Sequence, residues 1–305
     1  MDKKINKVNL LEEINMLEIL HAIKSGKYLI LTLTLVFSLL MSLLAFNLPN
    51  IYKSTALLAS VENQTNSNLS QFGGIASLAG ISVDGSADDK SDEAIQRIQT
   101  YDFFINHFLP SIALENLMAV KSWNSEGNLL SYDAYDPIEK KWSKNHLLPW
   151  LKVSKEPSKQ VAYKKYKKIL SIEKDRQTSF VRLSVSHESP HISKKWADLI
   201  VDKINESMRN EERLRTTKSI EFLNNQITIT NYKEIKESIA ALQEEQMKSL
   251  MLVEANKSYI FKILDYPIAP EEKSAPNRIM FILLGIFFGI IIGSVAAIYR
   301  FYKSH

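Results

Sequence analysis

The sequence from Ser189 to Val253 reads SPHISKKWADLIVDKINESMRNEERLRTTKSIEFLNNQITITNYKEIKESIAALQEEQMKSLMLV. After Pro190 it contains neither glycine nor proline, so no residue in it forces a helix to end. Its first third has apolar residues at helical spacing, and these are Ile192, Trp196, Leu199, Ile200, Ile204 and Met208. The pattern predicts a long helical arm that starts at Ser189 and Pro190 and buries one side.

The middle of this arm is polar. Residues 209–219 contain one large apolar residue, Leu214, and we expect them to stand in water. Glu211 precedes Arg215 in the i,i+4 order that favours an ion pair. The apolar pattern resumes at Ile220. A helix with apolar residues near both ends and a solvent-exposed middle is expected to project from a folded domain.

The arm must also turn back. Residues 169–173 and 179–186 predict a β-hairpin before it, and residues 258–264 predict a strand of the same sheet after it. A single helix over the whole arm would extend roughly 95 Å and leave the chain far from that strand. The β-branched residues 228–230, followed by Asn231, are where we expect the break. The arm is therefore predicted to be a helical hairpin.

Composition limits the classes of function. The chain has 305 residues, 45 % of them hydrophobic, which is enough for a real core and one or two domains. The net charge of +4 is small and the basic residues alternate with acidic ones, so nucleic acid is not an expected partner. The absence of cysteine excludes disulfides, thiolate metal sites and cysteine nucleophiles.

Two uncharged segments bracket the chain. Residues 28–48 and 279–299 are each long enough to span about 31 Å, which matches a hydrocarbon core of roughly 30 Å. The alternatives are a cleaved signal peptide for the first and a buried core helix for the second, but both runs are long for those roles. Five lysines precede the first segment, so we place both termini in the cytoplasm and the large domain on the other side.

Three glycines lie on one face of the second segment. Gly285, Gly289 and Gly293 repeat at four-residue spacing, which lets another helix backbone approach closely. We predict helix packing there. The alternative is that glycine is simply common in membrane helices.

The remaining segments predict a mixed base. Residues 9–24 predict an amphipathic helix, residues 51–61 a strand, residues 88–109 a helix, and residues 111–120 a second short helix. The Gly-rich run at 73–80 lacks the Gly-Lys-Ser/Thr ending of a phosphate-binding loop, so we interpret it as a flexible loop.

Two further patterns leave alternatives open. Trp123, Trp142 and Trp150 fall in residues 121–157, which we expect to be poorly ordered, and they either bind sugar or clamp a loop onto the core. The lysines of residues 161–168 either attract an anionic surface or form a solvated helix face.

One motif is rejected. His187-Glu188-Ser189-Pro190-His191 matches the zinc-protease pattern H-E-x-x-H, which places both imidazoles on one face only when it is helical. Pro190 disfavours a helix through that pattern but suits the first turn of the helix that follows. We expect no metal, no cofactor and no catalytic residue in this chain.

The pattern as a whole resembles the chain-length determinant (Wzz-type) family of polysaccharide co-polymerases. The resemblance covers nearly the whole chain, including residues 52–56 after the first span and the Ser189-Pro190 opening of the arm. Its most specific part is the proline segment that runs into the second span, with Pro267, Pro270 and Pro276. Such prolines give a stiff, extended connection.

The resemblance implies an α+β periplasmic domain with a projecting helical hairpin between two transmembrane helices of the bacterial inner membrane. The predicted division is residues 1–27 cytoplasmic leader, 28–48 first span, 49–188 base, 189–257 arm, 258–278 return strand and Pro-rich segment, 279–299 second span and 300–305 cytoplasmic tail.

The resemblance also implies a function without bond chemistry. Homo-oligomers of this type set the chain length of O-antigen or a related glycan, which a separate membrane polymerase builds on undecaprenyl-linked units. The expected partners are further copies of the chain, the polymerase, the undecaprenyl-linked glycan and the lipid bilayer. The alternative is a capsule or exopolysaccharide export co-polymerase that works with a separately encoded tyrosine kinase. A periplasmic sensor is disfavoured by the short C-terminal tail.

Overall fold

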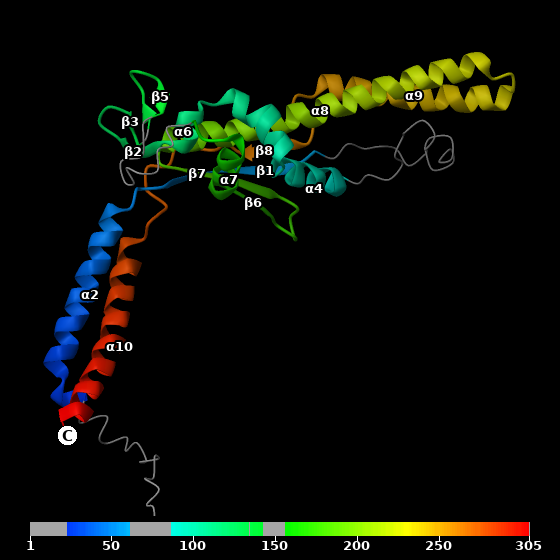
Figure 1. Ribbon diagram of the computed structural model, residues 1–305. Coiled ribbons are helices and arrows are strands. Elements are labelled where there is room, and N and C mark those ends of the chain that lie inside the picture. The colour runs from blue at the N-terminus through cyan, green and yellow to red at the C-terminus, as the bar shows by residue number, and fades with distance from the viewer. Residues whose placement is uncertain (1–22, 62–86, 134, 143–155, 305) are drawn as a thin grey trace, which may run out of the picture. The chain divides into compact units, whose positions relative to one another are not determined.

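The computed structural model describes residues 23–61, 87–133, 135–142 and 156–304 (Figure 1). Most of the predicted amphipathic helix at 9–24, the Gly-rich run at 73–80 and Trp150 lie outside these residues. The chain divides into two compact units, a span unit of residues 1–50 and 274–305 and a sheet unit of residues 51–273.

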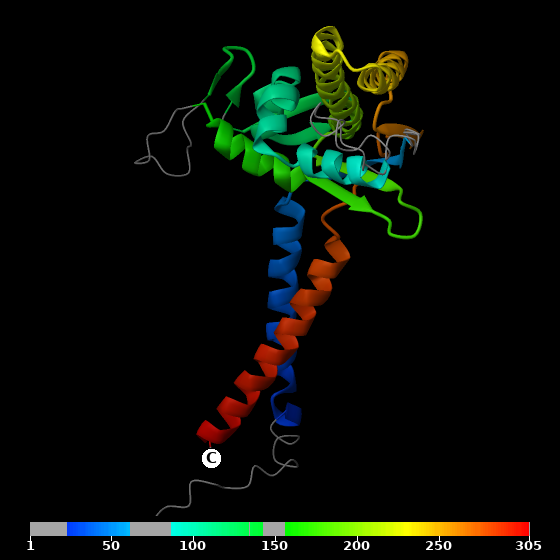
Figure 2. The same ribbon diagram turned by 90° about the vertical axis from the view of Figure 1, so that its right-hand side faces the viewer.

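The span unit contains two apolar helices, α2 (Lys27–Asn47) and α10 (Arg278–Ser304), which run side by side in both views (Figure 2). Their apolar windows have mean hydropathies of 2.5 and 2.7, and only 6 % and 17 % of those windows are buried. A core helix of a soluble domain would be mostly covered, whereas these helices expose their leucines and isoleucines. Both are long and apolar enough to cross a membrane.

The sheet unit is built on a four-stranded antiparallel sheet. Its order is β6 (Leu170–Lys174), β7 (Val181–His187), β1 (Tyr52–Ser60) and β8 (Phe261–Asp265). Burial alternates over only part of β7: Val181, Leu183 and Val185 are fully buried and Arg182 is exposed, but Ser184 is buried as well. The predicted β-hairpin and the shared sheet are confirmed. The return strand starts three residues later than predicted.

Helices cover the buried face of the sheet. They are α4 (Ala87–Ile98), α5 (Tyr101–Phe103), the π-helical turn Phe104–Phe108, the 3-10 turn Leu109–Ser111, α6 (Leu114–Met118), α7 (Lys159–Ile169) and the first half of α8 (Pro190–Ile229). Aromatic side chains fill the centre, because Phe108 contacts Tyr166 at 4.8 Å and Trp196 at 5.6 Å between ring centroids. These three residues join the covering helices into one core.

Two expectations for the base were wrong. The helix predicted to run to residue 109 is interrupted after Ile98, because the Thr100 hydroxyl accepts the Phe103 amide at 3.1 Å and starts a new helix. Residues 121–157 are not uniformly irregular. They contribute the hairpin of β2 (Val120–Asn124) and β3 (Leu129–Tyr132), and the two-residue strands β4 (Tyr135–Asp136) and β5 (Lys141–Trp142). Neither hairpin has the alternation of apolar and polar residues that is typical of a strand, so these strands could not be predicted from the sequence pattern.

The arm is a helical hairpin, as predicted. Helix α8 has 40 residues and α9 (Lys233–Ala255) has 23, and they lie side by side where they leave the sheet (Figure 1). The turn falls at residues 230–232, beside the predicted break. The mixed α/β fold with a long helical hairpin and two candidate membrane helices near the ends is therefore confirmed.

Candidate functional site

The two helices of the arm pack through a narrow apolar seam. Leu223 of α8 and Leu242 of α9 are each 1 % exposed, and Ile239 is 3 % exposed. The Gln243 side-chain amide donates to the Asn224 side-chain oxygen at 2.7 Å, which fixes the register of the hairpin. The buried seam holds the two helices together, while most of the remaining arm surface faces solvent.

The polar middle of α8 is only partly as predicted. Leu214 is 57 % exposed, but Thr216 and Ser219 are only 1 % and 4 % exposed, so one side of this polar segment is covered. Glu211 and Arg215 do not pair with each other as expected. Arg215 instead donates to Glu212 at 2.7 Å, and Glu211 pairs with a residue of α4.

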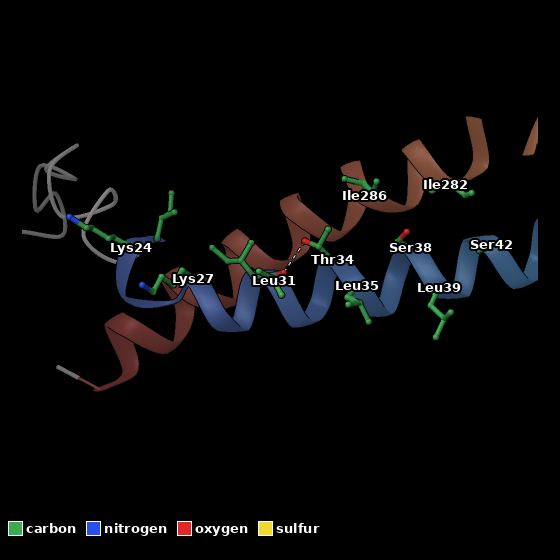
Figure 3. Close-up of a pocket in the computed structure, with 12 residues that line it drawn as sticks. Lys24, Lys27, Leu31, Thr34, Leu35, Ser38, Leu39, Ser42, Ile282 and Ile286 are labelled. Atoms are coloured by element: carbon green, nitrogen blue, oxygen red, sulfur yellow. Dashed lines mark hydrogen bonds between the residues drawn. The ribbon is translucent and has the colours of Figure 1, made fainter. Parts of the chain in front are cut away.

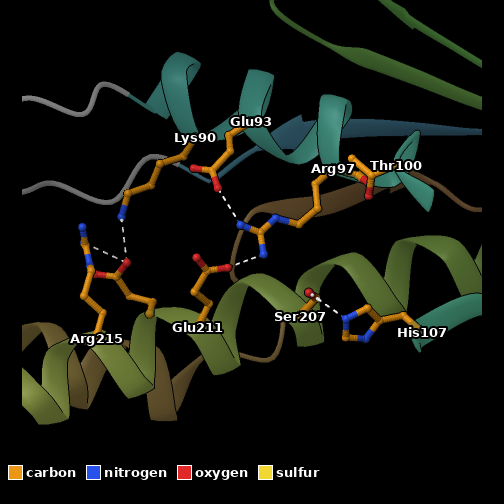
Figure 4. Close-up of polar contacts among 9 residues, drawn as sticks. Lys90, Glu93, Arg97, Thr100, His107, Ser207, Glu211 and Arg215 are labelled. Carbon is orange, nitrogen blue, oxygen red and sulfur yellow. Dashed lines mark hydrogen bonds and ion pairs between the residues drawn. The ribbon is translucent and has the colours of Figure 1, made fainter. Parts of the chain in front are cut away.

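Helix α4 is held against α8 by charged side chains (Figure 4). Arg97 of α4 donates both to Glu93 at 2.8 Å and to Glu211. Partial burial alone would lower the pKa of Arg97, but these hydrogen bonds outweigh it and the pKa is raised. Lys90 lies 3.8 Å from Glu212, whose side chain is 13 % exposed. Each surface pair contributes at most about 1 kcal/mol, so the network mainly fixes the position of α4.

A buried asparagine fastens α8 to the return strand. The Asn205 carbonyl oxygen accepts the backbone amides of Ile260 and Phe261 at 2.9 Å each, and its amide group donates to the Phe261 carbonyl at 3.0 Å. Asn205 is 6 % exposed, so these bonds are shielded from water. Asn205 is not among the predicted site residues, although the position of a polar residue directly after Ile204 of the apolar stripe was a signal for such a role.

The start of the arm lies where the sequence places it. Ser189 is the residue before the helix and Pro190 is its first residue. Ser189 makes no side-chain cap. Its backbone amide donates instead to His187 Nδ1 at 2.9 Å, and its carbonyl accepts the Ser193 amide at 3.0 Å. The functional role of Ser189 and Pro190 stays a prediction.

The geometry of His187 is that of a structural histidine. It ends β7, outside the helix, and its Nε2 lies 2.8 Å from the Asn116 carbonyl oxygen. Since Nδ1 accepts the Ser189 amide, Nε2 carries the proton and donates to Asn116. Both ring nitrogens are thus engaged. Burial lowers the pKa of His187, although nearby Glu188 partly opposes the shift.

The contact between Ser207 and His107 resembles a nucleophile and its base but lacks the rest of such a site. Ser207 Oγ lies 3.2 Å from His107 Nε2 (Figure 4), and Ser207 is 7 % exposed. Catalytic triads need a third group that orients the imidazole. Within the described part of the chain no carboxylate bonds to the other nitrogen of His107, whose ring stacks on Phe103 at 5.4 Å. We interpret the pair as a packing contact.

Trp123 is engaged in contacts within the base. Its ring meets Tyr52 edge-on at 5.6 Å and His191 at 5.8 Å, and its Nε1 donates to the Asn128 side chain at 2.8 Å. These contacts favour the clamp interpretation for this tryptophan.

The three glycines of α10 lie against α2. A Cβ atom on Gly289 would be 2.5 Å from Thr34 Cα, and one on Gly293 would be 2.9 Å from Ile30 Cα. A Cβ on Gly285 would be 2.9 Å from Ser38 Cα. The helix that faces these glycines therefore belongs to the same chain.

Beside this crossing runs an open groove of about 1110 Å³ (Figure 3). Its walls include Leu31, Leu35 and Leu39 of α2, which are 59–63 % exposed. Lys24 and Lys27 lie at one end. In a bilayer such a groove is filled by lipid chains or by another apolar helix, and the bilayer stays a predicted partner.

The proline segment is anchored at its first part. Pro267 is buried, and the Ser54 hydroxyl of β1 donates to the Ile268 carbonyl at 2.7 Å. Pro270 is half-buried in the sheet unit, and Pro276 belongs to the span unit. The role of the three prolines in setting the geometry of the domain stays a prediction.

One family model matches part of the chain. Residues 12–103 match the model of the family described as Wzz, chain length determinant protein. A search of curated proteins found no match. A solved structure of a full-length bacterial polysaccharide co-polymerase is 10 % identical, covers 94 % of this chain and 97 % of its own, and has a TM-score of 0.42. A fragment of WzzB, a polysaccharide co-polymerase from Salmonella Typhimurium, is 11 % identical, covers 74 % of this chain and 100 % of its own, and has a TM-score of 0.29.

The matched residues contain α2, β1 and α4, which are the first candidate span, a central strand and a helix that contacts the arm. With the two apolar helices, this match indicates a membrane protein. The resemblance to the Wzz chain-length determinant family is therefore confirmed over residues 12–103.

Proposed function

We propose that this protein is a non-catalytic regulator of the chain length of an O-antigen-type glycan, working as a homo-oligomer in the bacterial inner membrane. The match of residues 12–103 to the chain-length determinant family carries the proposal. In this proposal both termini are cytoplasmic, and the sheet unit with its arm is periplasmic. A separate membrane polymerase extends the glycan on undecaprenyl-linked units.

The arm supports a scaffolding role by its shape and surface. The part of the hairpin near its turn exposes Ile229 at 70 % and Tyr232 at 71 %, and Met251 of α9 is 62 % exposed. Exposed apolar side chains of this size favour contact with another protein surface. In the proposed assembly, arms and bases of several copies hold polymerase and glycan together, so the shape of the oligomer biases when extension stops.

The cheapest test is deletion of the gene followed by electrophoresis of lipopolysaccharide. The proposal expects the ladder of O-chain lengths to lose its preferred length, and expects a plasmid copy of the gene to restore it. An unchanged ladder would contradict the proposal. Loss of capsule with a normal ladder would favour the alternative, an export co-polymerase that works with a separately encoded tyrosine kinase.

A further inference from the structure

A small pocket with both polar and apolar lining residues lies where α8 meets the return strand. Its volume is about 230 Å³, and its lining comes from α8, from residues 257–258 after α9, and from Ile263 of β8. Drug-sized ligands occupy roughly 300–1,000 Å³, so this pocket suits something smaller. It is separate from the glycine crossing and from the ion pairs between α4 and α8.

One wall of the pocket is fastened to the return strand. Asn205 forms part of the lining, and its side chain makes the three hydrogen bonds that fasten α8 to Ile260 and Phe261. Its neighbours on the same helix, Asp202 and Glu206, are therefore held at a fixed position relative to Ser258. A pocket with a fixed wall loses little conformational freedom when a ligand binds.

The charges of the pocket balance. Asp202 and Glu206 supply two carboxylates, and Arg209 and Lys257 supply two cations. Glu206 already accepts a hydrogen bond from Lys203 at 2.8 Å, which lowers the pKa of Glu206. Arg209 lies close enough to Glu206 to help lower the pKa of that carboxyl. Within the described residues, however, the side chains of Asp202, Arg209 and Lys257 form no hydrogen bond and no close ion pair, so their donors and acceptors remain available to a ligand.

This set of groups selects a class of ligand. A polyanion would gain no net attraction from two cations that stand beside two carboxylates, and an apolar ligand would leave four charged groups without water. A sugar ring carries hydroxyl groups that donate to carboxylates and accept from guanidinium and ammonium groups. The apolar side chains of Val201 and Ile263 can lie against the carbon face of the ring.

We infer that this pocket is a subsite for one sugar residue of the glycan, bound by Asp202, Arg209, Lys257 and Ser258 at the root of the arm. The inference rests on the proposed function and deepens it. It implies that the part of α8 that packs on the return strand contacts the glycan directly, in addition to any effect of the oligomer's shape on glycan length.

The test measures sugar binding by the purified full-length protein in detergent. The probe is the lipid-free oligosaccharide of one to three repeat units, released by mild acid from glycan of the same cells, and binding is followed by saturation-transfer NMR. Arg209→Ala should weaken binding about tenfold, since a hydrogen bond to a charged group is lost. Arg213→Ala is the matched control, because Arg213 lies one turn further along α8 and pairs with Glu254 outside the pocket.

Absence of binding to the wild-type protein, or equal binding by the Arg209→Ala and wild-type proteins, would overturn the inference. Should Arg209→Ala fail to fold, Lys257→Ala removes a donor from a residue outside any helix and must weaken binding in the same way. Gene deletion separates the two claims. An altered ladder with unchanged binding by Arg209→Ala refutes the pocket alone, whereas an unaltered ladder refutes the proposed function.

Discussion

Substitution of Gly289 by alanine should separate the two membrane helices. The added Cβ would lie 2.5 Å from Thr34 Cα and 3.3 Å from Thr34 C, and both are backbone atoms that cannot rotate away. Ordinary contacts at Cβ begin near 3.4 Å, so the helices must move apart by about 1 Å. Overpacking of this kind costs about 1–3 kcal/mol, which reduces the paired population roughly 5- to 150-fold relative to the separated one.

Cysteine cross-linking can measure this effect, because the natural chain has no cysteine. Ser42 of α2 and Ile282 of α10 line the same groove, about one turn beyond the contact of Gly285 with Ser38, so cysteines at these two positions should cross-link faster when the helices are paired than when they are apart. Adding Gly289→Ala should slow that cross-linking, whereas Val295→Leu, at a position that is 63 % exposed, should not. Cross-linking of the Gly289→Ala protein at the original rate would refute the packing argument.

Three further predictions follow from the sheet unit and the prolines. Asn205→Leu leaves three buried backbone groups unpaired, so it should lower the free energy of unfolding, measured in urea, by about 3 kcal/mol or more. A loss below about 1 kcal/mol would show instead that water replaces the side chain as the hydrogen-bonding partner. Because burial lowers the pKa of His187 below its ordinary 6.5, stability should be full above pH 6.5 and fall as the pH drops from there toward the folded pKa. His187→Gln should flatten that slope in thermal unfolding, and an unchanged slope would assign it to other groups. Simultaneous replacement of Pro267, Pro270 and Pro276 by alanine should change the length distribution of the glycan while leaving insertion of the protein into the membrane nearly unchanged. A normal glycan length in this variant would show that the segment acts only as a spacer.

The helical hairpin could be predicted because two local patterns and one distance agreed. A stretch without glycine or proline indicated a helix, and the β-branched residues before Asn231 offered a break. The strands on either side required the chain to return, and the turn lies at residues 230–232. When local preference and global geometry agree in this way, a structure can be predicted from the sequence.

The attachment of the arm could not be predicted in the same way. The partner of Glu211 is Arg97 of α4, more than a hundred residues away, whereas the local rule pointed to Arg215. The hydrogen bonds of Asn205 are made to backbone groups of the return strand, and no sequence pattern predicts which backbone groups these are. Long-range polar contacts of this kind appear only when the elements are assembled.

The interruption at Thr100 was locally visible, since threonine favours the start of a helix.

The rejected zinc motif shows how one residue can decide between two interpretations. Pro190 begins α8, so His187 lies on the strand before it and turns its ring nitrogens toward the Ser189 amide and the Asn116 carbonyl. The pattern of letters alone would have suggested a metalloprotease. Proline suits the first turn of a helix, so the position of Pro190 argues against a metalloprotease from the sequence alone.

The central claim is that this protein sets the length of a glycan, and the most direct measurement is the distribution of O-chain lengths as its expression is raised from zero in a deletion strain. We predict a broad distribution without the protein and a single preferred length that sharpens as expression rises. A distribution that stays the same at every expression level, in cells where the protein is present in the membrane, would contradict the account.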